Sequence, residues 1–188
     1  GSAATGKDLG LAIQGASSDG TSYFASGRTT SRQLAFDVPP GELVLKLKVI
    51  DGRDEELENA NRKITVPAFD DATLAVGSPM ILRTRTAREA RAITEGAEGP
   101  PEARREFDRT DRLFVRFPVY GGEGIATAAR LLNRRGKELG VLTVAPLKDG
   151  IYQVDLPLST SLRDDYVIAI EATRGTDSAK AFVPFRVR

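Results

Sequence analysis

The stretch Glu42-Leu-Val-Leu-Lys-Leu-Lys-Val-Ile-Asp51 decides the fold class of this 188-residue chain. One face of this stretch carries the side chains of Leu43, Leu45, Leu47 and Val49. The opposite face includes two lysines, so the hydrophobic pattern repeats every two residues, as in a half-buried β-strand. A Pro-Pro-Gly corner at 39–41 precedes the strand, and the polar residues 52–61 lead into a return strand over 62–67. The pattern predicts a β-hairpin.

The same order of corner, strand, polar hairpin and return strand recurs near the C-terminus, over 162–187. Further strand candidates with turn residues between them fall at 9–16, 22–28, 33–38, 72–76, 79–84, 111–120, 125–133, 141–145 and 151–158. Short strands at this spacing are typical of β-sandwiches. We therefore predict an all-β chain of two tandem immunoglobulin-like β-sandwich domains, 1–77 and 78–188. The first has about six strands, one short of the usual seven.

Residues 86–104 differ from the rest because they are rich in Ala, Glu and Arg. The first half predicts a short helix, which the Gly-Pro cluster at 96–101 ends. We expect this segment to be an insertion in the second domain. Five aromatic residues are predicted to build the core of that domain. The core position is favoured for those whose side chains lie on the same strand face as Val115 and Val119. The alternative is that the aromatic residues form an exposed patch that binds a partner. The five residues are Phe114, Phe117, Tyr120, Phe182 and Phe185.

The composition excludes several kinds of chemistry. The chain contains no His and no Cys, which rules out Ser-His-Asp and Cys-His catalysis, thiolate or imidazole zinc sites, Fe–S clusters and disulfides. Its 27 basic and 26 acidic residues give a net charge of +1, whereas a nucleic-acid-binding protein normally has a clear basic excess. We predict no cofactor, no nucleic-acid partner and no membrane insertion. Gly1-Ser2 resembles a protease scar, so we expect a fragment of a longer protein.

The chain resembles the C-terminal region of bacterial von Willebrand factor A-related domain proteins over roughly residues 34–188. The resemblance is one of pattern and rests on residues 36–41, 64–67, 106–121, 127–136, 152–158, 165–171 and 182–187. It implies immunoglobulin-like modules, a von Willebrand A domain upstream in the same polypeptide, and an exported, extracytoplasmic protein. The Asp-x-Ser-x-Ser motif of the A domain does not occur in this sequence. No functional residue is carried over from the family.

The acidic hairpin offers a candidate Ca²⁺ site at Asp51, Asp54 and Glu56, because hard cations prefer oxygen ligands. Asp70-Asp71, at the predicted junction between the domains, would contribute further carboxylate ligands to this site. The spacing lacks the alternation of an EF-hand, and neighbouring basic residues neutralise part of the charge. A solvated loop tip is therefore the favoured interpretation.

Arg83, Arg85, Arg88 and Arg91 are the candidate partner-binding residues, and Arg104 and Arg105 continue this basic stretch. An anionic partner would suit them. Glutamates interleave with these arginines, and no aromatic residue lies nearby to stack on a base. A salt-bridged surface segment is the favoured alternative.

Two carboxylate pairs, Asp164-Asp165 and Asp108/Asp111, have the composition that glycosidases use. Both pairs fall at predicted corners, where Asp caps turns. Tyr166 opens the penultimate strand and predicts a tyrosine corner, with its hydroxyl bonded to backbone upstream. The favoured function is a non-catalytic accessory, spacer or protein-interaction region. The alternatives are a carbohydrate-binding module, which the absence of Trp disfavours, and a carboxylate-based hydrolase.

Overall fold

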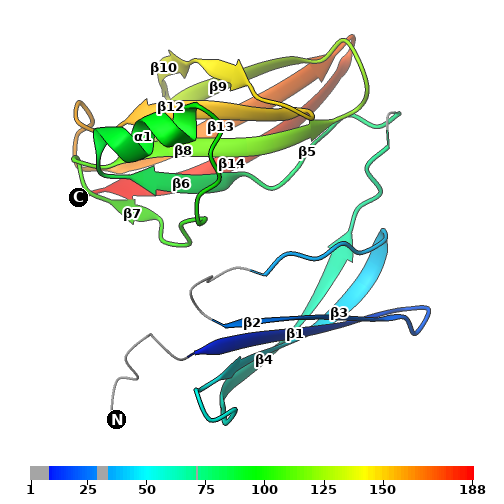
Figure 1. The fold of residues 1–188 in the computed structure, drawn as a ribbon. Coiled ribbons are helices and arrows are strands. Elements are labelled where there is room, and N and C mark those ends of the chain that lie inside the picture. The colour runs from blue at the N-terminus through cyan, green and yellow to red at the C-terminus, as the bar shows by residue number, and fades with distance from the viewer. Residues whose placement is uncertain (1–8, 29–33, 71) are drawn as a thin grey trace. The chain divides into compact units, whose positions relative to one another are not determined.

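The computed structural model describes residues 9–28, 34–70 and 72–188, and the chain divides into two compact units, Gly1–Ala68 and Phe69–Arg188 (Figure 1). The sequence predicts this boundary after residue 77. Strand β5 (Ala75–Val76), the observed part of the predicted strand 72–76, instead pairs with the end of β8 (Arg112–Tyr120). The boundary therefore moves to 68/69, because backbone pairing holds β5 in the second unit.

The first unit is one antiparallel sheet with the strand order β2-β1-β3-β4. Its strands are β1 (Gly10–Ser17), β2 (Ser22–Arg28), β3 (Gly41–Ile50) and β4 (Glu56–Val66). Strands β3 and β4 form the predicted hairpin. Leu43 lies opposite Ile64 of β4, and Leu47 lies opposite Ile13 of β1. Directly opposed residues project from the same face of a sheet, so the alternating pattern collects the apolar side chains on one face.

Within its described residues the first unit contains this single sheet, whereas the sequence predicts a two-sheet sandwich. The predicted strand 33–38 has no strand pairing over its described residues 34–38, and Gln33 lies outside the described residues. A Cβ placed on Gly27 would lie 2.8 Å from Leu34 Cδ2. Gly27 lies opposite Leu11 on the apolar face. This segment thus covers part of that face by side-chain packing alone.

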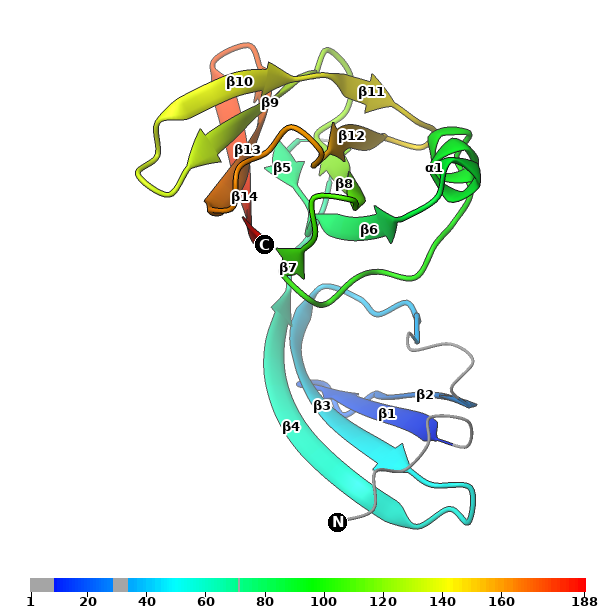
Figure 2. The same cartoon turned by 90° about the vertical axis from the view of Figure 1, so that its left-hand side faces the viewer.

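The second unit is a β-sandwich, as predicted. One sheet has the order β10-β9-β13-β14-β7; the other has the order β11-β12-β8-β5, and β6 also pairs with β8 (Figures 1 and 2). The remaining strands are β6 (Met80–Thr84), β7 (Glu106–Phe107), β9 (Ala126–Asn133), β10 (Glu138–Leu142), β11 (Val144–Pro146), β12 (Ile151–Pro157), β13 (Asp165–Arg174) and β14 (Asp177–Val187). β13 and β14 form the predicted C-terminal hairpin.

The core of the second unit lies between its two sheets. Leu113, Val115 and Phe117 alternate along β8 and have no exposed surface. They share one cluster with Ile168 of β13 and Phe185 of β14. The predictions for Phe117 and Phe185 are therefore confirmed. The period-two pattern of β8 fixes which of its side chains enter this core.

Three of the five predicted core aromatics are placed differently. Phe182 is 61% exposed, because it lies one residue away from the buried Val183 and so projects from the outer face of β14. Tyr120 is half-buried and stacks on Phe69. Phe114 is buried on the other side of β8, in a second cluster beneath the helix.

That helix, α1 (Ala87–Thr94), confirms the short helix predicted within 86–104. Thr86 Oγ1 accepts a 3.2 Å hydrogen bond from the N–H of Glu89, and the Glu89 carboxylate accepts one of 3.1 Å from the N–H of Thr86. This reciprocal pair is a capping box, which satisfies two donors at a helix start. Ala90 and Ile93 pack on Leu82 and Phe114. No helix in the described part of the chain has the length and apolar character needed to span a bilayer.

Candidate anion-binding hollow

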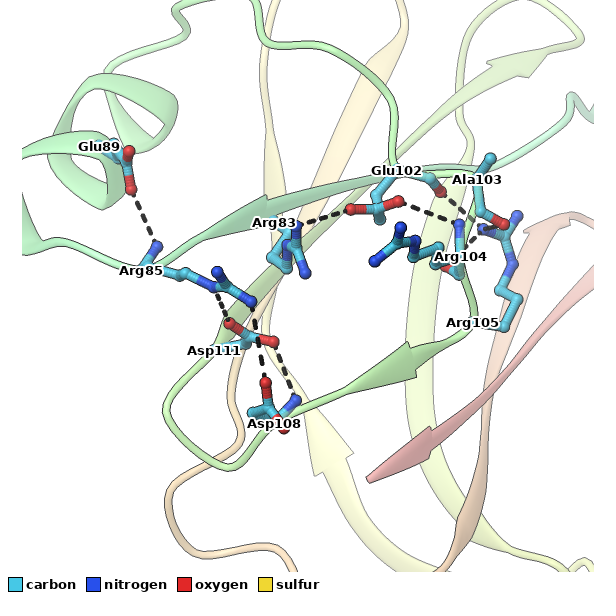
Figure 3. Close-up of polar contacts among 9 residues, drawn as sticks. All are labelled: Arg83, Arg85, Glu89, Glu102, Ala103, Arg104, Arg105, Asp108 and Asp111. Carbon is cyan, nitrogen blue, oxygen red and sulfur yellow. Dashed lines mark hydrogen bonds and ion pairs between the residues drawn. The ribbon is translucent and has the colours of Figure 1, made fainter. Parts of the chain in front are cut away.

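The basic stretch contributes to a hollow of about 380 Å³ on the second unit, which we call the arginine hollow. It forms where the segment after β6 and the segment that leads into β7 approach each other (Figure 3). It is lined by five arginines, two acidic residues and one phenylalanine: Arg83, Arg85, Arg104, Arg105, Arg188, Glu106, Asp108 and Phe107. The structure therefore brings together two of the four predicted partner-binding residues, Arg83 and Arg85.

Arg88 and Arg91, the other two predicted residues, do not line the hollow. Both lie in α1 and are exposed. The Arg91 guanidinium forms a 2.8 Å ion pair with Glu95, one helical turn further on. For Arg91, the salt-bridged surface predicted as the alternative is what the structure contains.

Arg83 is held by Glu102. Arg83 Nη2 lies 3.0 Å from Glu102 Oε2, and the other oxygen of that carboxylate accepts a 3.1 Å hydrogen bond from the N–H of Arg104. The N–H of Glu102 in turn donates to the carbonyl of Ile81 in β6 at 2.7 Å. Glu102 thus links β6 to the segment that crosses the hollow (Figure 3).

Arg85 is held by the predicted carboxylate pair Asp108/Asp111. Its Nε donates a 3.0 Å hydrogen bond to Asp111 Oδ1, and its Nη2 lies 3.8 Å from Asp108 Oδ2. The Asp111 side chain is fully buried, and its second oxygen accepts a 2.9 Å bond from the N–H of Asp108. The hydrogen bond to Asp111 raises the pKa of Arg85, so the guanidinium stays charged. The Asp111 carboxylate caps the turn by accepting the N–H of Asp108, as predicted, and both carboxylates pair with Arg85.

Arg104 and Arg105 differ from Arg83 and Arg85. Arg105 Nη1 donates to three main-chain carbonyls, those of Glu102 at 2.7 Å and of Ala103 and Arg104 at 3.2 Å each. These acceptors fix the side chain but carry no net charge. Across the described residues, no carboxylate lies within 4.0 Å of either guanidinium. Arg188, by contrast, forms an ion pair with Glu106.

The electrostatics of the hollow follow from these contacts. The carboxylates of Glu102, Asp108, Asp111 and Glu106 are paired with Arg83, Arg85 or Arg188. The positive charges of Arg104 and Arg105 remain without a carboxylate partner among the described residues. A planar guanidinium with several N–H donors suits the two oxygens of a carboxylate or phosphate. The arrangement can therefore bind an oxyanion.

The candidate Ca²⁺ ligands are not gathered into a metal site. Asp51 Oδ1 accepts hydrogen bonds from the N–H groups of Arg53 at 2.8 Å and Glu55 at 2.9 Å, and Glu56 forms an ion pair with Lys48. Asp54 adopts a positive φ of 62° in the same turn. Within the described ranges no group of three metal-ligating side chains occurs. These contacts match the loop-tip interpretation.

Two further predicted carboxylate groups also serve local structure. Asp70 Oδ1 accepts the N–H of Thr73 at 2.7 Å, whereas Asp71 lies outside the described residues. In the pair Asp164-Asp165, both Asp165 oxygens accept from Arg186, at 2.6 and 3.0 Å, and Asp164 Oδ1 accepts the N–H of Asp165 at 2.8 Å. The Asp165 carboxylate is thus engaged by Arg186, and the Asp164 carboxylate caps the adjacent main chain, as in the predicted turn-capping role.

Arg188 also lines the arginine hollow, although nothing in the sequence around it predicts this. Arg188 arrives there because β7 pairs in parallel with the end of β14, and the N–H of Arg188 donates to the carbonyl of Phe107 at 2.9 Å. No local pattern marks this pairing. Arg104 and Arg105 carried a signal, since they continue the basic stretch after the glycine and proline residues.

Comparison with known proteins gave matches to solved structures alone. Neither a protein-family model nor a curated protein matches the chain. A two-domain fibronectin type-III segment of chicken tenascin is 12% identical with a TM-score of 0.35, covering 94% of this chain and 83% of that one. The FN1–FN3 domains of chicken CNTN1 are 8% identical with a TM-score of 0.33, covering 96% and 56%. Fibronectin(III)-like modules of Clostridium thermocellum CbhA are 12% identical with a TM-score of 0.31, covering 100% and 82%. No functional residue is transferred from them.

Proposed function

We propose that this chain is a non-catalytic accessory region of a larger exported bacterial protein and that it acts as a spacer and protein-interaction module. The observation that carries this proposal is the arginine hollow, where Arg104 and Arg105 present charges that no described carboxylate neutralises. Such a surface suits contact with an acidic partner. The carboxylates that a hydrolase would need are engaged in structural hydrogen bonds, as with Asp111 and Asp165.

On the resemblance of residues 34–188, we further propose an upstream von Willebrand A domain as a partner within the same polypeptide and an extracytoplasmic location. A two-sheet sandwich is stiff and has loops at both ends, which suits the presentation of an attached domain. The test is the full-length gene. A von Willebrand A domain and an export signal upstream support the proposal, and a cytoplasmic enzyme domain in their place contradicts it.

The interaction role is tested with the purified chain. Affinity purification from the source cells after chemical cross-linking should identify a partner, and calorimetry with that purified partner should give saturable binding. An unrelated β-sandwich of similar charge is the matched control. A chain that instead hydrolyses glycoside or ester substrates, with activity lost in Asp165→Asn, would overturn the non-catalytic assignment.

A carbohydrate-binding role is the second candidate, because Phe69 stacks on Tyr120 with a 4.0 Å separation between ring centroids and remains 42% exposed. Exposed aromatic rings offer an apolar face to a sugar. By contrast, Tyr152 and Tyr166 stack on the buried rings of Phe117 and Phe185, so the candidate sugar-binding surface among these stacked pairs is limited to Phe69 and Tyr120. Glycan-array binding that disappears in Tyr120→Ala supports this role; an array without specific binding removes it.

A further inference from the structure

We propose that the arginine hollow receives an extended segment of a protein partner that carries Asp or Glu side chains. The inference rests on the proposed interaction role and adds to it the site and the chemistry of the segment. Charge, backbone direction and size each contribute to it.

The charge of the hollow favours a short acidic segment over a long polyanion. Arg104 and Arg105 supply two charges without described carboxylate partners, which one or two acidic side chains would match. Glu106 and Asp108 also line the hollow, and although each is paired with an arginine, their carboxylates would repel further negative charges placed beside them. A nucleic acid or heparin-like chain, with a charge on every unit, would bring its neighbouring charges against these two carboxylates.

The backbone direction of β6 favours a peptide over a free anion. The register of β6 against β8 shows which backbone groups of β6 are used in that pairing. The carbonyl of Pro118 in β8 points toward the β5–β6 side, because it accepts a hydrogen bond from the N–H of Gly77 at 2.9 Å. The carbonyl of Ile81 faces away from β8 and accepts from Glu102 at 2.7 Å. Backbone groups of alternate residues in a strand face the same side. The N–H and C=O of Arg83 therefore also point away from β8, toward the segment that lines the hollow.

Strand β7 repeats this arrangement on the other side of the hollow. The carbonyls of Arg105 and Phe107 accept from Arg186 and Arg188 of the C-terminal segment, at 2.7 and 2.9 Å. By the same alternation the backbone groups of Glu106 face away from β14. Exposed strand edges can bind an extended peptide through main-chain hydrogen bonds, while side chains give specificity. Here the guanidinium groups would select carboxylates.

The size of the hollow agrees with a peptide that inserts one or two side chains. Its volume of about 380 Å³ is at the lower end of the range for ligand sites. The guanidinium of Arg105 is already oriented by three carbonyls, so little side-chain freedom remains to be lost on binding.

The test uses the full chain and a fluorescein-labelled octapeptide of alternating glutamate and threonine, with binding followed by fluorescence anisotropy. We expect saturable binding that weakens by about tenfold or more in the double variant Arg104→Gln/Arg105→Gln, because two charge-assisted contacts are lost. The matched control is Arg88→Gln/Arg91→Gln, which removes the same charge from outside the hollow and should bind as the parent does. Circular dichroism melting checks that both variants fold.

Three further probes sharpen the outcome. The first probe is the same octapeptide with glutamine in place of glutamate, which should bind weakly because it lacks the charge. The second is the glutamate octapeptide with N-methylated backbone nitrogens, which should bind weakly because it lacks main-chain donors. Inorganic phosphate should compete only at concentrations well above that of the peptide. The proposal fails if the Arg88/Arg91 variant loses as much affinity as the Arg104/Arg105 variant, if N-methylation has no effect, or if phosphate binds as tightly as the peptide.

Failure of this inference can be separated from failure of the interaction role. A partner found by affinity purification that still binds the Arg104→Gln/Arg105→Gln variant with parental affinity would overturn the assignment of the hollow and leave the interaction role standing. A partner that loses binding in this variant and keeps it in Arg88→Gln/Arg91→Gln supports both.

Discussion

Arg116 Nη2 donates a 2.7 Å hydrogen bond to the main-chain carbonyl of Ile93, in the last turn of α1. Its Nε donates to Gln153 Oε1, also at 2.7 Å, and the residue is 8% exposed. Burial lowers the pKa of the Arg116 guanidinium, and the charge of Glu98 opposes this shift. A buried side chain of β8 thus holds the C-terminal end of the inserted helix, where carbonyl groups need donors.

Replacing Arg116 with methionine should loosen α1. The change removes both donors and leaves the buried Gln153 oxygen without its partner, so we expect a loss of about 1–3 kcal/mol in the free energy of unfolding. Urea unfolding measures this loss, and hydrogen exchange measures the protection of α1. The control Arg91→Met removes an 82% exposed side chain and should change stability by less than about 0.5 kcal/mol. Unchanged protection of α1 in Arg116→Met would contradict the role given to Arg116.

Tyr166 confirms the predicted tyrosine corner, because its hydroxyl donates to the carbonyl of Leu162 at 2.9 Å. Tyr166→Phe keeps the ring stacked on Phe185 and removes only this bond, so we expect a loss of about 0.5–1.5 kcal/mol in unfolding free energy. Tyr166→Leu also removes the aromatic packing and should cost more. Thermal unfolding of the two variants measures both effects. Equal melting temperatures would show that the stacked ring adds nothing.

The elements predicted correctly from the sequence are those set by neighbouring residues. The alternation of Leu43 to Val49 predicted β3, and the Ala-, Glu- and Arg-rich composition of the first half of 86–104 predicted α1. The corner at Tyr166 depends on a residue only four positions away. Such features need no knowledge of distant contacts, so periodicity and turn chemistry suffice to predict them.

The features that escaped prediction depend on contacts between distant segments. Arg188 reaches the arginine hollow only because β14 pairs with the two-residue strand β7. Arg116 alternates along β8 like a solvent-facing residue, and its burial follows from the position of α1 above it. The segment at Leu34 has a strand-like sequence, yet it packs without strand pairing. Tertiary placement decided each case, and no local pattern records it.

The acidic hairpin of the first unit should respond to mutation and not to calcium. Asp51→Ala removes the carboxylate that accepts the N–H groups of Arg53 and Glu55, so we expect a loss of about 1 kcal/mol in stability. The melting temperature of the parent chain should be the same with calcium and with a chelator. Differential scanning calorimetry of both proteins under both conditions is the measurement. A calcium-dependent rise that disappears in Asp51→Ala would establish a metal site.

The pair Asp165 and Arg186 should make stability depend on acid pH. The hydrogen bond from Arg186 is the main cause that lowers the pKa of Asp165. A carboxyl whose pKa is lower in the folded than in the unfolded chain stabilises the fold above its unfolded pKa of about 3.9, and this contribution is lost as the pH falls through the folded pKa. We therefore expect the unfolding free energy of the parent to fall more steeply below about pH 4 than that of Asp165→Asn. Urea unfolding over a pH series measures the two slopes. Asp164→Asn leaves the pair intact and should keep the parental slope, whereas equal slopes for the parent and Asp165→Asn would contradict the assignment.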